Sequence, residues 1–143
     1  MGPEAERSKD CDVAAYSLRF DRQHGVLLIT FGKLATPASA LAVRGAVEHF
    51  LESEETCYLI ADLSAVEKTE ITGDFVRSLA WTPTVIPSAK QRVIVAPRPE
   101  LYGLSRMFQL YRDAMATDIQ VVRTLEEAEA LLGLDSPNFE VVS

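Results

Sequence analysis

The stretch ADLSAVEKTEITGDF, residues 61–75, gathers the acids and hydroxyl groups whose spacing could support chemistry. Its four acids, Asp62, Glu67, Glu70 and Asp74, are of the type that forms general acid/base pairs. Their spacing fits no glycosidase signature, because those enzymes need two carboxyl groups held at a fixed distance across a sugar. We therefore interpret them as solvated acids of a turn, with a glycine and the first turn of a helix after them.

The remaining nucleophiles and bases do not indicate catalysis. We expect His24, in a predicted hairpin turn, and His49, on the polar side of a predicted helix, to be exposed. Cys11 and Cys57 are too few and too far apart for a metal site or a disulfide framework, so we expect reduced thiols. The sequence contains no G-x-S-x-G, P-loop or G-x-G-x-x-G motif. We predict a chain that is not an enzyme, with no catalytic residue, no metal and no cofactor.

The charge balance limits the partners. Fourteen basic and 21 acidic residues give a formal net charge of −7, which argues against binding a nucleic-acid backbone or an anionic membrane surface. The apolar runs are too short to span a bilayer, and the polar N-terminus lacks the apolar core of a signal peptide. We expect a cytoplasmic protein with a flexible tail over residues 1–15, no nucleic-acid partner and no membrane insertion.

Strands and helices alternate along the rest of the chain. Continuous apolar runs or hairpin patterns predict strands, and apolar spacing of three and four residues between capping signals predicts helices. The predicted strands are 16–20, 25–31, 57–62, 92–96 and 119–122, and the predicted helices are 37–53, 72–81, 97–115 and 125–132. The order ββαβαβαβα predicts an α/β domain over 16–133, with a mostly parallel sheet, one antiparallel edge hairpin and packed helices. The C-terminal tail, 134–143, would be an edge strand, a partner contact or a loose end.

Two details of packing follow from the same patterns. The helix over 37–53 has apolar residues at helical spacing, which predicts that they share one buried face. They are Leu41, Val47, Phe50 and Leu51, with Ala38 and Ala42. The apolar run 93–95 has no polar alternation, so we expect all three residues to be largely buried in a central parallel strand with helices over both faces.

The candidate site follows from this topology. In an open parallel sheet, ligands tend to bind beyond the carboxyl ends of the strands. The loops 62–72 and 97–103 meet at that edge, and two helices begin there with free N–H groups that suit an anion. The predicted binding edge for a partner or ligand consists of Asp62, Ser64, Thr69, Glu70, Arg98, Tyr102 and Arg106.

Thr72 has two interpretations. It lies at or just before the start of the helix over 72–81, where its hydroxyl would accept a hydrogen bond from a free backbone N–H. A phosphate on that hydroxyl would also meet the helix dipole favourably. Glu70 and Asp74 would repel it unless an arginine of the neighbouring loop reaches across. Helix capping is the simpler interpretation, and a phospho-acceptor is the alternative.

The segment DLSAVEKTEITG resembles the D-L-S-x-V-x-x-x-D-S-S-G stretch of STAS domains, the fold of anti-sigma-factor antagonists and of sulfate-transporter tails. Matching residues are Asp62, Leu63, Ser64, Val66 and Gly73. Glu70 stands where that family has aspartate, and Ile71 replaces the first serine. Thr72 stands where the family has its phosphorylated serine, which implies a phospho-acceptor at this position.

The second half is similar to a bacterial branch of this family that is grouped with STAS and CRAL-TRIO folds. RVIVAPRPELYGLSRMFQLYRD and VVRTLEEAEALLGL carry that likeness, and the whole resemblance covers residues 16–133. It implies a non-enzymatic regulatory module that presents the 62–73 loop and the following helix to a protein such as a kinase-type anti-sigma factor. A homodimer is a further possible assembly. The alternative is a carrier or sensor of a small apolar or lipid-like ligand held between helices and sheet.

Overall fold

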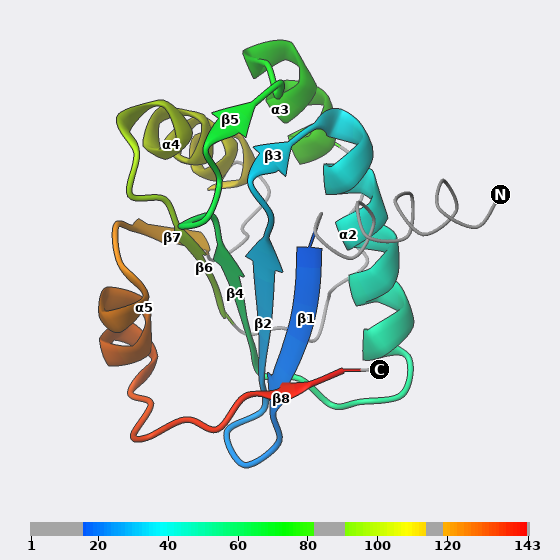
Figure 1. Cartoon of the computed structure of the whole chain (residues 1–143), viewed down its shortest axis with the longest axis vertical. Coiled ribbons are helices and arrows are strands. Elements are labelled where there is room, and N and C mark those ends of the chain that lie inside the picture. Colours follow the sequence, from blue (N-terminus) through cyan, green and yellow to red (C-terminus); the bar gives the residue numbers. More distant parts are fainter. Residues whose placement is uncertain (1–15, 82–90, 114–118, 143) are drawn as a thin grey trace, which may run out of the picture.

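The computed structural model describes residues 16–81, 91–113 and 119–142 (Figure 1). The expected N-terminal tail with Cys11, and residues 114–115 of the third predicted helix, lie outside the described residues. The strands are β1 (Tyr16–Asp21), β2 (Val26–Phe31), β3 (Leu34–Ala35), β4 (Tyr58–Asp62), β5 (Lys68–Thr69), β6 (Gln91–Val95), β7 (Ile119–Val122) and β8 (Glu140–Val141). The helices are α2 (Pro37–Leu51), α3 (Gly73–Trp81), α4 (Pro99–Asp113) and α5 (Leu125–Leu132).

Six strands form the main sheet in the order β7-β6-β4-β2-β1-β8. β2, β4, β6 and β7 are parallel to one another, whereas β1 is antiparallel to β2 and β8 is antiparallel to β1. The predicted α/β class and the mostly parallel sheet with an antiparallel hairpin are confirmed. Of the alternatives for the C-terminal tail, the structure contains the edge strand. β3 and β5 form a small parallel pair that the sequence patterns missed.

Local signals explain where these elements begin and end. Thr36 caps α2 through a capping box with Ser39, and the same arrangement joins Thr124 to Glu127 at the start of α5. These side-chain bonds satisfy backbone N–H groups that a helix end otherwise leaves unpaired. Gly133 ends α5 with φ +68°, in the left-handed region that glycine adopts without strain.

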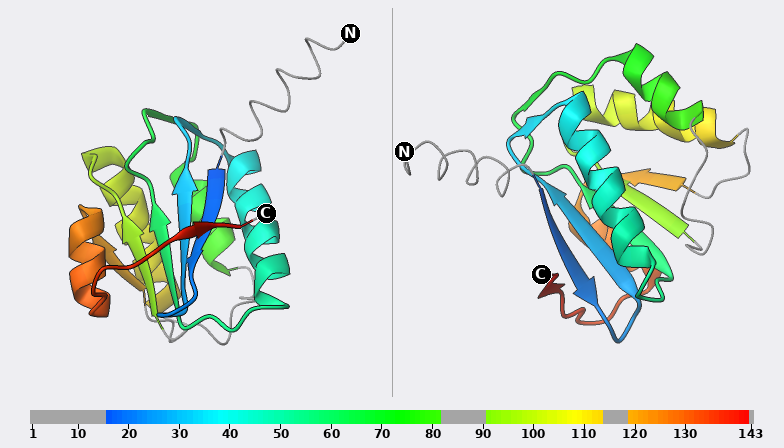
Figure 2. Two further views of the ribbon diagram at one scale, coloured as in Figure 1. Left: turned by 60° about the horizontal axis from the view of Figure 1, so that its bottom comes forward. Right: turned by 90° about the vertical axis from the view of Figure 1, so that its right-hand side faces the viewer.

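The two faces of the sheet carry different helices. Alternate residues of β2 and β4, among them Leu27 and Leu59, pack toward α2, and their neighbours Val26 and Ile60 pack toward α5. Figure 2 shows α2 and α5 on opposite sides of the sheet. α3 packs chiefly against α4, and the two helices lie side by side (Figure 2). α4 begins at the carboxyl end of the sheet and runs back along β7, where the Gln109 side chain donates to the carbonyl oxygen of Ile119, the first residue of β7.

The inward face of α2 differs from the prediction. Leu41 is 53% exposed, and the buried residues are Ser39, Val43 and Val47. The helix carries alanine, valine and leucine on more than one side, so its spacing permits two inward faces. Packing against the sheet selects the face with the two valines.

The central strand β6 is also less uniform than predicted. Val93 and Val95 are 1% and 0% exposed, as expected, but Ile94 is less completely buried. Val93 and Val95 face α5, where the packing is dense. Ile94 faces the other side and lines a hollow between the sheet, α3 and α4. Ile94 is therefore mostly buried, as expected, but less completely than its two neighbours because it borders the hollow.

Candidate functional site

The two loops at the carboxyl end of the parallel strands are in contact. The Arg98 guanidinium, in the loop after β6, donates to the Glu67 carbonyl oxygen at 3.0 Å. The Leu63 N–H donates to the Val95 carbonyl oxygen at 2.9 Å, which continues the pairing of β4 and β6 into the loops. The topological rule that predicted this meeting is confirmed, and it fixes the 62–72 loop against the start of α4.

Four of the predicted edge residues lie in that loop. Asp62 is 9% exposed and its Oδ1 accepts from the Ser64 N–H at 2.9 Å and from the Ser64 hydroxyl. Thr69 accepts from the Ile71 N–H at 3.1 Å. The Glu70 backbone is held by a 2.8 Å bond to the Ala35 carbonyl oxygen, and its side chain is exposed. Asp62, Ser64 and Thr69 thus shape the loop, and Glu70 is presented to solvent.

The charged and polar contacts of Tyr102 and Arg106 lie outside the 62–72 loop. The guanidinium of Arg123 lies over the Tyr102 ring, 4.4 Å from its centroid. Arg106 donates to the Gln109 side chain, whose amide nitrogen donates to the Ile119 carbonyl oxygen at 2.7 Å. Arg106 therefore bonds a residue of its own helix, and Tyr102 contacts Arg123 just after β7 while it also packs against the apolar cluster that contains Val66 of the 62–72 loop. Arg98 is the predicted edge arginine that contacts the 62–72 loop, and its bond is to Glu67.

Thr72 is the N-cap of α3. Its hydroxyl accepts from the Phe75 N–H at 3.2 Å, and its carbonyl oxygen accepts from the Val76 N–H at 3.0 Å. Its side chain is exposed, and Asp74 follows in the first turn, where a negative charge complements the helix dipole. The predicted position of Thr72 and its capping bond are confirmed.

A hollow of about 200 Å³ lies beneath α3. It is bounded by the sheet, by α2 and by α4, and its walls are almost entirely hydrocarbon. The lining residues are Phe31, Ala35, Ala40, Ala61, Leu63, Thr69, Ile71, Phe75, Val76, Leu79, Ile94, Leu101, Leu104, Ser105 and Phe108. Sequence reasoning missed this cavity. Its only sequence signal is the small side chains of Ala35, Ala40 and Ala61, which come from three separate segments.

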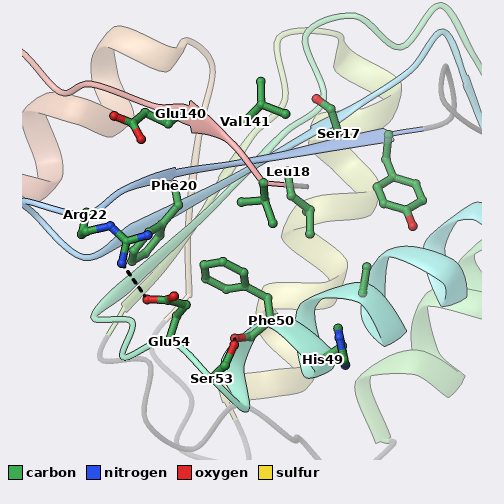
Figure 3. Close-up of a pocket in the computed structure, with 13 residues that line it drawn as sticks. Ser17, Leu18, Phe20, Arg22, His49, Phe50, Ser53, Glu54, Glu140 and Val141 are labelled. Atoms are coloured by element: carbon green, nitrogen blue, oxygen red, sulfur yellow. Dashed lines mark hydrogen bonds and ion pairs between the residues drawn. The ribbon is translucent and has the colours of Figure 1, made fainter.

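A larger groove of about 770 Å³ lies between β1, β8 and the end of α2 (Figure 3). Phe20 and Phe50 meet edge-on at its base with ring centroids 5.0 Å apart. The Arg22–Glu54 ion pair at 3.1 Å closes one end, as the dashed line in Figure 3 marks. This groove lies away from the 62–73 loop and combines apolar with polar walls.

His24 differs from the expectation of simple exposure. Its Nδ1 lies 2.7 Å from Oδ2 of Asp21, a carboxylate that is 1% exposed, and the ring is partly buried. Burial alone would raise the pKa of Asp21, but hydrogen bonds from His24 and from the Asn138 N–H outweigh burial and lower that pKa. Sequence reasoning missed this cluster. His49 is exposed, as predicted.

Neither metal ligands nor a membrane span is found in the described parts of the chain. Within residues 16–81, 91–113 and 119–142, no group of three or more His, Cys, Asp or Glu side chains could hold a metal ion. No helix in those ranges is both long and apolar enough to cross a bilayer.

No protein-family model matches the chain, and no curated protein or solved structure matches it either. The relation to STAS domains therefore remains a resemblance of the quoted segments.

Proposed function

We propose that the chain is a non-enzymatic regulatory module of STAS type that presents the 62–73 loop and α3 to a protein partner in the bacterial cytoplasm. The observation that carries this proposal is Thr72, an exposed hydroxyl at the N-cap of α3. It stands at the position where the resemblance has the phosphorylated serine. The strand order, with antiparallel β1 beside parallel β2, β4 and β6, is compatible with a STAS-like arrangement.

The chemistry of this surface suits a docking event that depends on charge. Glu70 and Asp74 are exposed on either side of Thr72, so a partner with a basic face, such as a kinase-type anti-sigma factor, would complement it. A phosphate on Thr72 would add a charge of about −1.5 to −2 to the same surface and change its affinity for that partner.

Site-specific crosslinking tests the proposal. A photo-crosslinking residue replaces Asp74 in the first turn of α3, and the matched control replaces Glu126, an exposed acid in the first turn of α5. We expect one protein to be captured in cells from position 74 and not from 126. The purified partner should bind Glu70→Arg at least tenfold more weakly than the parent chain, because the substitution places a positive charge opposite the basic face of that partner. Identical capture from both positions would contradict the proposal.

The second candidate, a carrier or sensor of a small apolar ligand, is favoured by the apolar cavity beneath α3. Native mass spectrometry of the purified chain separates the two. A co-purifying small molecule supports the carrier, whereas a bare monomer or homodimer favours the interaction module.

A further inference from the structure

The cavity beneath α3 has the chemistry of a binding site for an uncharged molecule. Thr69 and Ser105 contribute the two hydroxyl groups of its lining, and the other lining residues are aliphatic, aromatic or alanine. An ion placed there would lose its hydration without a charged partner, which is strongly unfavourable. The hollow is partly open to solvent, but its apolar lining offers water few polar partners, so an apolar molecule can displace water from it.

The volume sets the size of the ligand. A cavity of roughly 150 Å³ lined by aliphatic and aromatic side chains accommodates benzene. At about 200 Å³, this one has room for a single ring with one or two small substituents, or a short branched chain. Full-length fatty acids and phospholipids are too large for it.

α3 contacts α4 at both ends and through Arg77, whose Nε donates to the Tyr111 hydroxyl at 3.5 Å, and its other side borders the cavity. A Cβ atom on Gly73 would lie 3.4 Å from the Met107 side chain, so the start of α3 rests on α4. At the other end, the buried Arg112 donates to the Ala80 carbonyl oxygen at 2.8 Å. The middle of α3 lines the cavity through Phe75, Val76 and Leu79. Side chains that border a void lack partner atoms on that side and forfeit dispersion contacts.

A ligand in the cavity would therefore restrain the helix that begins at Thr72. We propose that this site binds a small uncharged apolar molecule of about six to ten non-hydrogen atoms, and that its occupancy fixes α3 and so regulates the presentation of the Thr72 surface. This inference rests on the second candidate function and joins it to the first, because α3 is both the roof of the cavity and the proposed docking element. Binding that restrains one helix changes the free energy of a second binding event on that helix.

Toluene is a suitable probe. Titrating toluene into the full chain, followed by methyl NMR, should give saturable shifts at Ile94, Val76 and Leu79 with a dissociation constant below about 1 mM. Ala40→Leu places a larger side chain in the cavity and should weaken toluene binding at least tenfold. Ala42→Leu makes the same change two residues along α2 at an exposed position, and should leave the affinity unchanged. Absence of saturable shifts in the parent chain overturns the inference and the carrier function together, and leaves the interaction module standing.

Hydrogen exchange tests the regulatory step separately. The Phe75 and Val76 amides, which bond Thr72, should exchange at least threefold more slowly in saturating toluene, while amides of α5 should not change. Binding without slower exchange in α3 overturns the regulation and leaves a carrier. If Ala40→Leu does not fold, Ala61→Val fills the cavity from β4 by a smaller step, and equal toluene affinity in that variant also overturns the assignment.

Discussion

The two ends of the sheet differ in their hydrogen bonding and in how densely they are packed. At the amino end of the parallel strands, the buried Asp21 accepts from the His24 N–H, from His24 Nδ1 and from the Asn138 N–H. Beside it, the Gly25 carbonyl oxygen accepts from the Cys57 and Tyr58 N–H groups at 2.8 and 3.1 Å. This end joins the hairpin, β4 and the C-terminal segment through satisfied bonds.

At the carboxyl end the same sheet meets a cavity, and the element above it rests on α4 rather than on the strands. Long-range bonds join the loops at this end, such as Arg98 to the Glu67 carbonyl oxygen and the Glu70 N–H to the Ala35 carbonyl oxygen, but the N-cap bond of Thr72 that starts α3 is local. We therefore expect the amino end of the sheet to contribute more to the free energy of unfolding than the carboxyl end does. α3, at the other end, can then be displaced or restrained without unfolding the domain.

The largest effect that this comparison predicts is a difference between two Leu→Ala substitutions. Leu27 is 0% exposed in the dense core, whereas Leu79 lines the cavity and is partly buried. We expect Leu27→Ala to lower the free energy of unfolding by about 3–5 kcal/mol and Leu79→Ala by less than about 2 kcal/mol, since Leu79 already has fewer neighbours to lose. Urea unfolding measures both. Equal losses would show that the two ends are equally well packed.

The next effect concerns Asp21. Asp21→Ala leaves the donors of His24 and Asn138 without their acceptor and should lower the free energy of unfolding by about 2–3 kcal/mol at pH 7. Asp62→Ala, at the other end, removes only the bonds to Ser64 and should lose roughly 1 kcal/mol.

Acid should remove this difference. The folded-state pKa of Asp21 lies below its ordinary value of 3.8, so its stabilisation is present above the unfolded-state pKa and is lost as pH falls through the folded-state pKa. Urea titrations at neutral pH and at successively lower pH below 3.8 should therefore show the parent chain approaching Asp21→Ala. A gap that stays constant over that range would rule out the carboxylate as its source.

Features that depend on residues close together in the sequence could be predicted, whereas features that depend on residues far apart in the sequence could not. The capping boxes at Thr36 and Thr124 and the helix end at Gly133 depend on residues within four positions. Local patterns could therefore predict helices that begin at 37 and 125 and one that ends at 132. Asp21 and Asn138 are 117 residues apart in sequence. No local pattern relates them, and the two-residue strands β3, β5 and β8 also form only through pairing with distant segments.

The candidate site likewise combines features that sequence rules predict with features that only tertiary packing determines. The meeting of the 62–72 and 97–103 loops follows from the rule for parallel sheets, and the position of Thr72 follows from its helix start. Tyr102 and Arg106 lie one turn apart on α4 and share a face. The rule places the start of that helix but not its rotation about its own axis, which packing against α3 and β7 sets. The cavity depends on three alanines brought together by the fold.

A smaller effect is expected at Thr72. Thr72→Ala removes the acceptor of the Phe75 N–H and should lower stability by roughly 0.5–2 kcal/mol, whereas Thr72→Ser keeps the hydroxyl and should be nearly neutral. Thermal unfolding of the three proteins measures this. If alanine leaves stability unchanged yet abolishes phosphate incorporation from a cell extract, capping is not the role of Thr72 and the phospho-acceptor interpretation is favoured.

The smallest effect concerns Leu41, which sequence spacing assigned to the core and which is 53% exposed. Leu41→Gln keeps a side chain of similar length and good helix propensity at an exposed position, so it should change the free energy of unfolding by less than about 0.5 kcal/mol. Val47→Ala, on the buried face six residues later, should lower it by about 1–3 kcal/mol because it removes packed methyl groups. Chemical denaturation of both variants at one pH is sufficient. The rotation of α2 that exposes Leu41 also turns Ala40 toward the cavity. A large loss from Leu41→Gln would mean that the helix is rotated as its spacing first suggested. Ala40 would then no longer line the cavity. In that case Ala40→Leu would not fill the cavity, and comparing it with the control Ala42→Leu would no longer test ligand binding there.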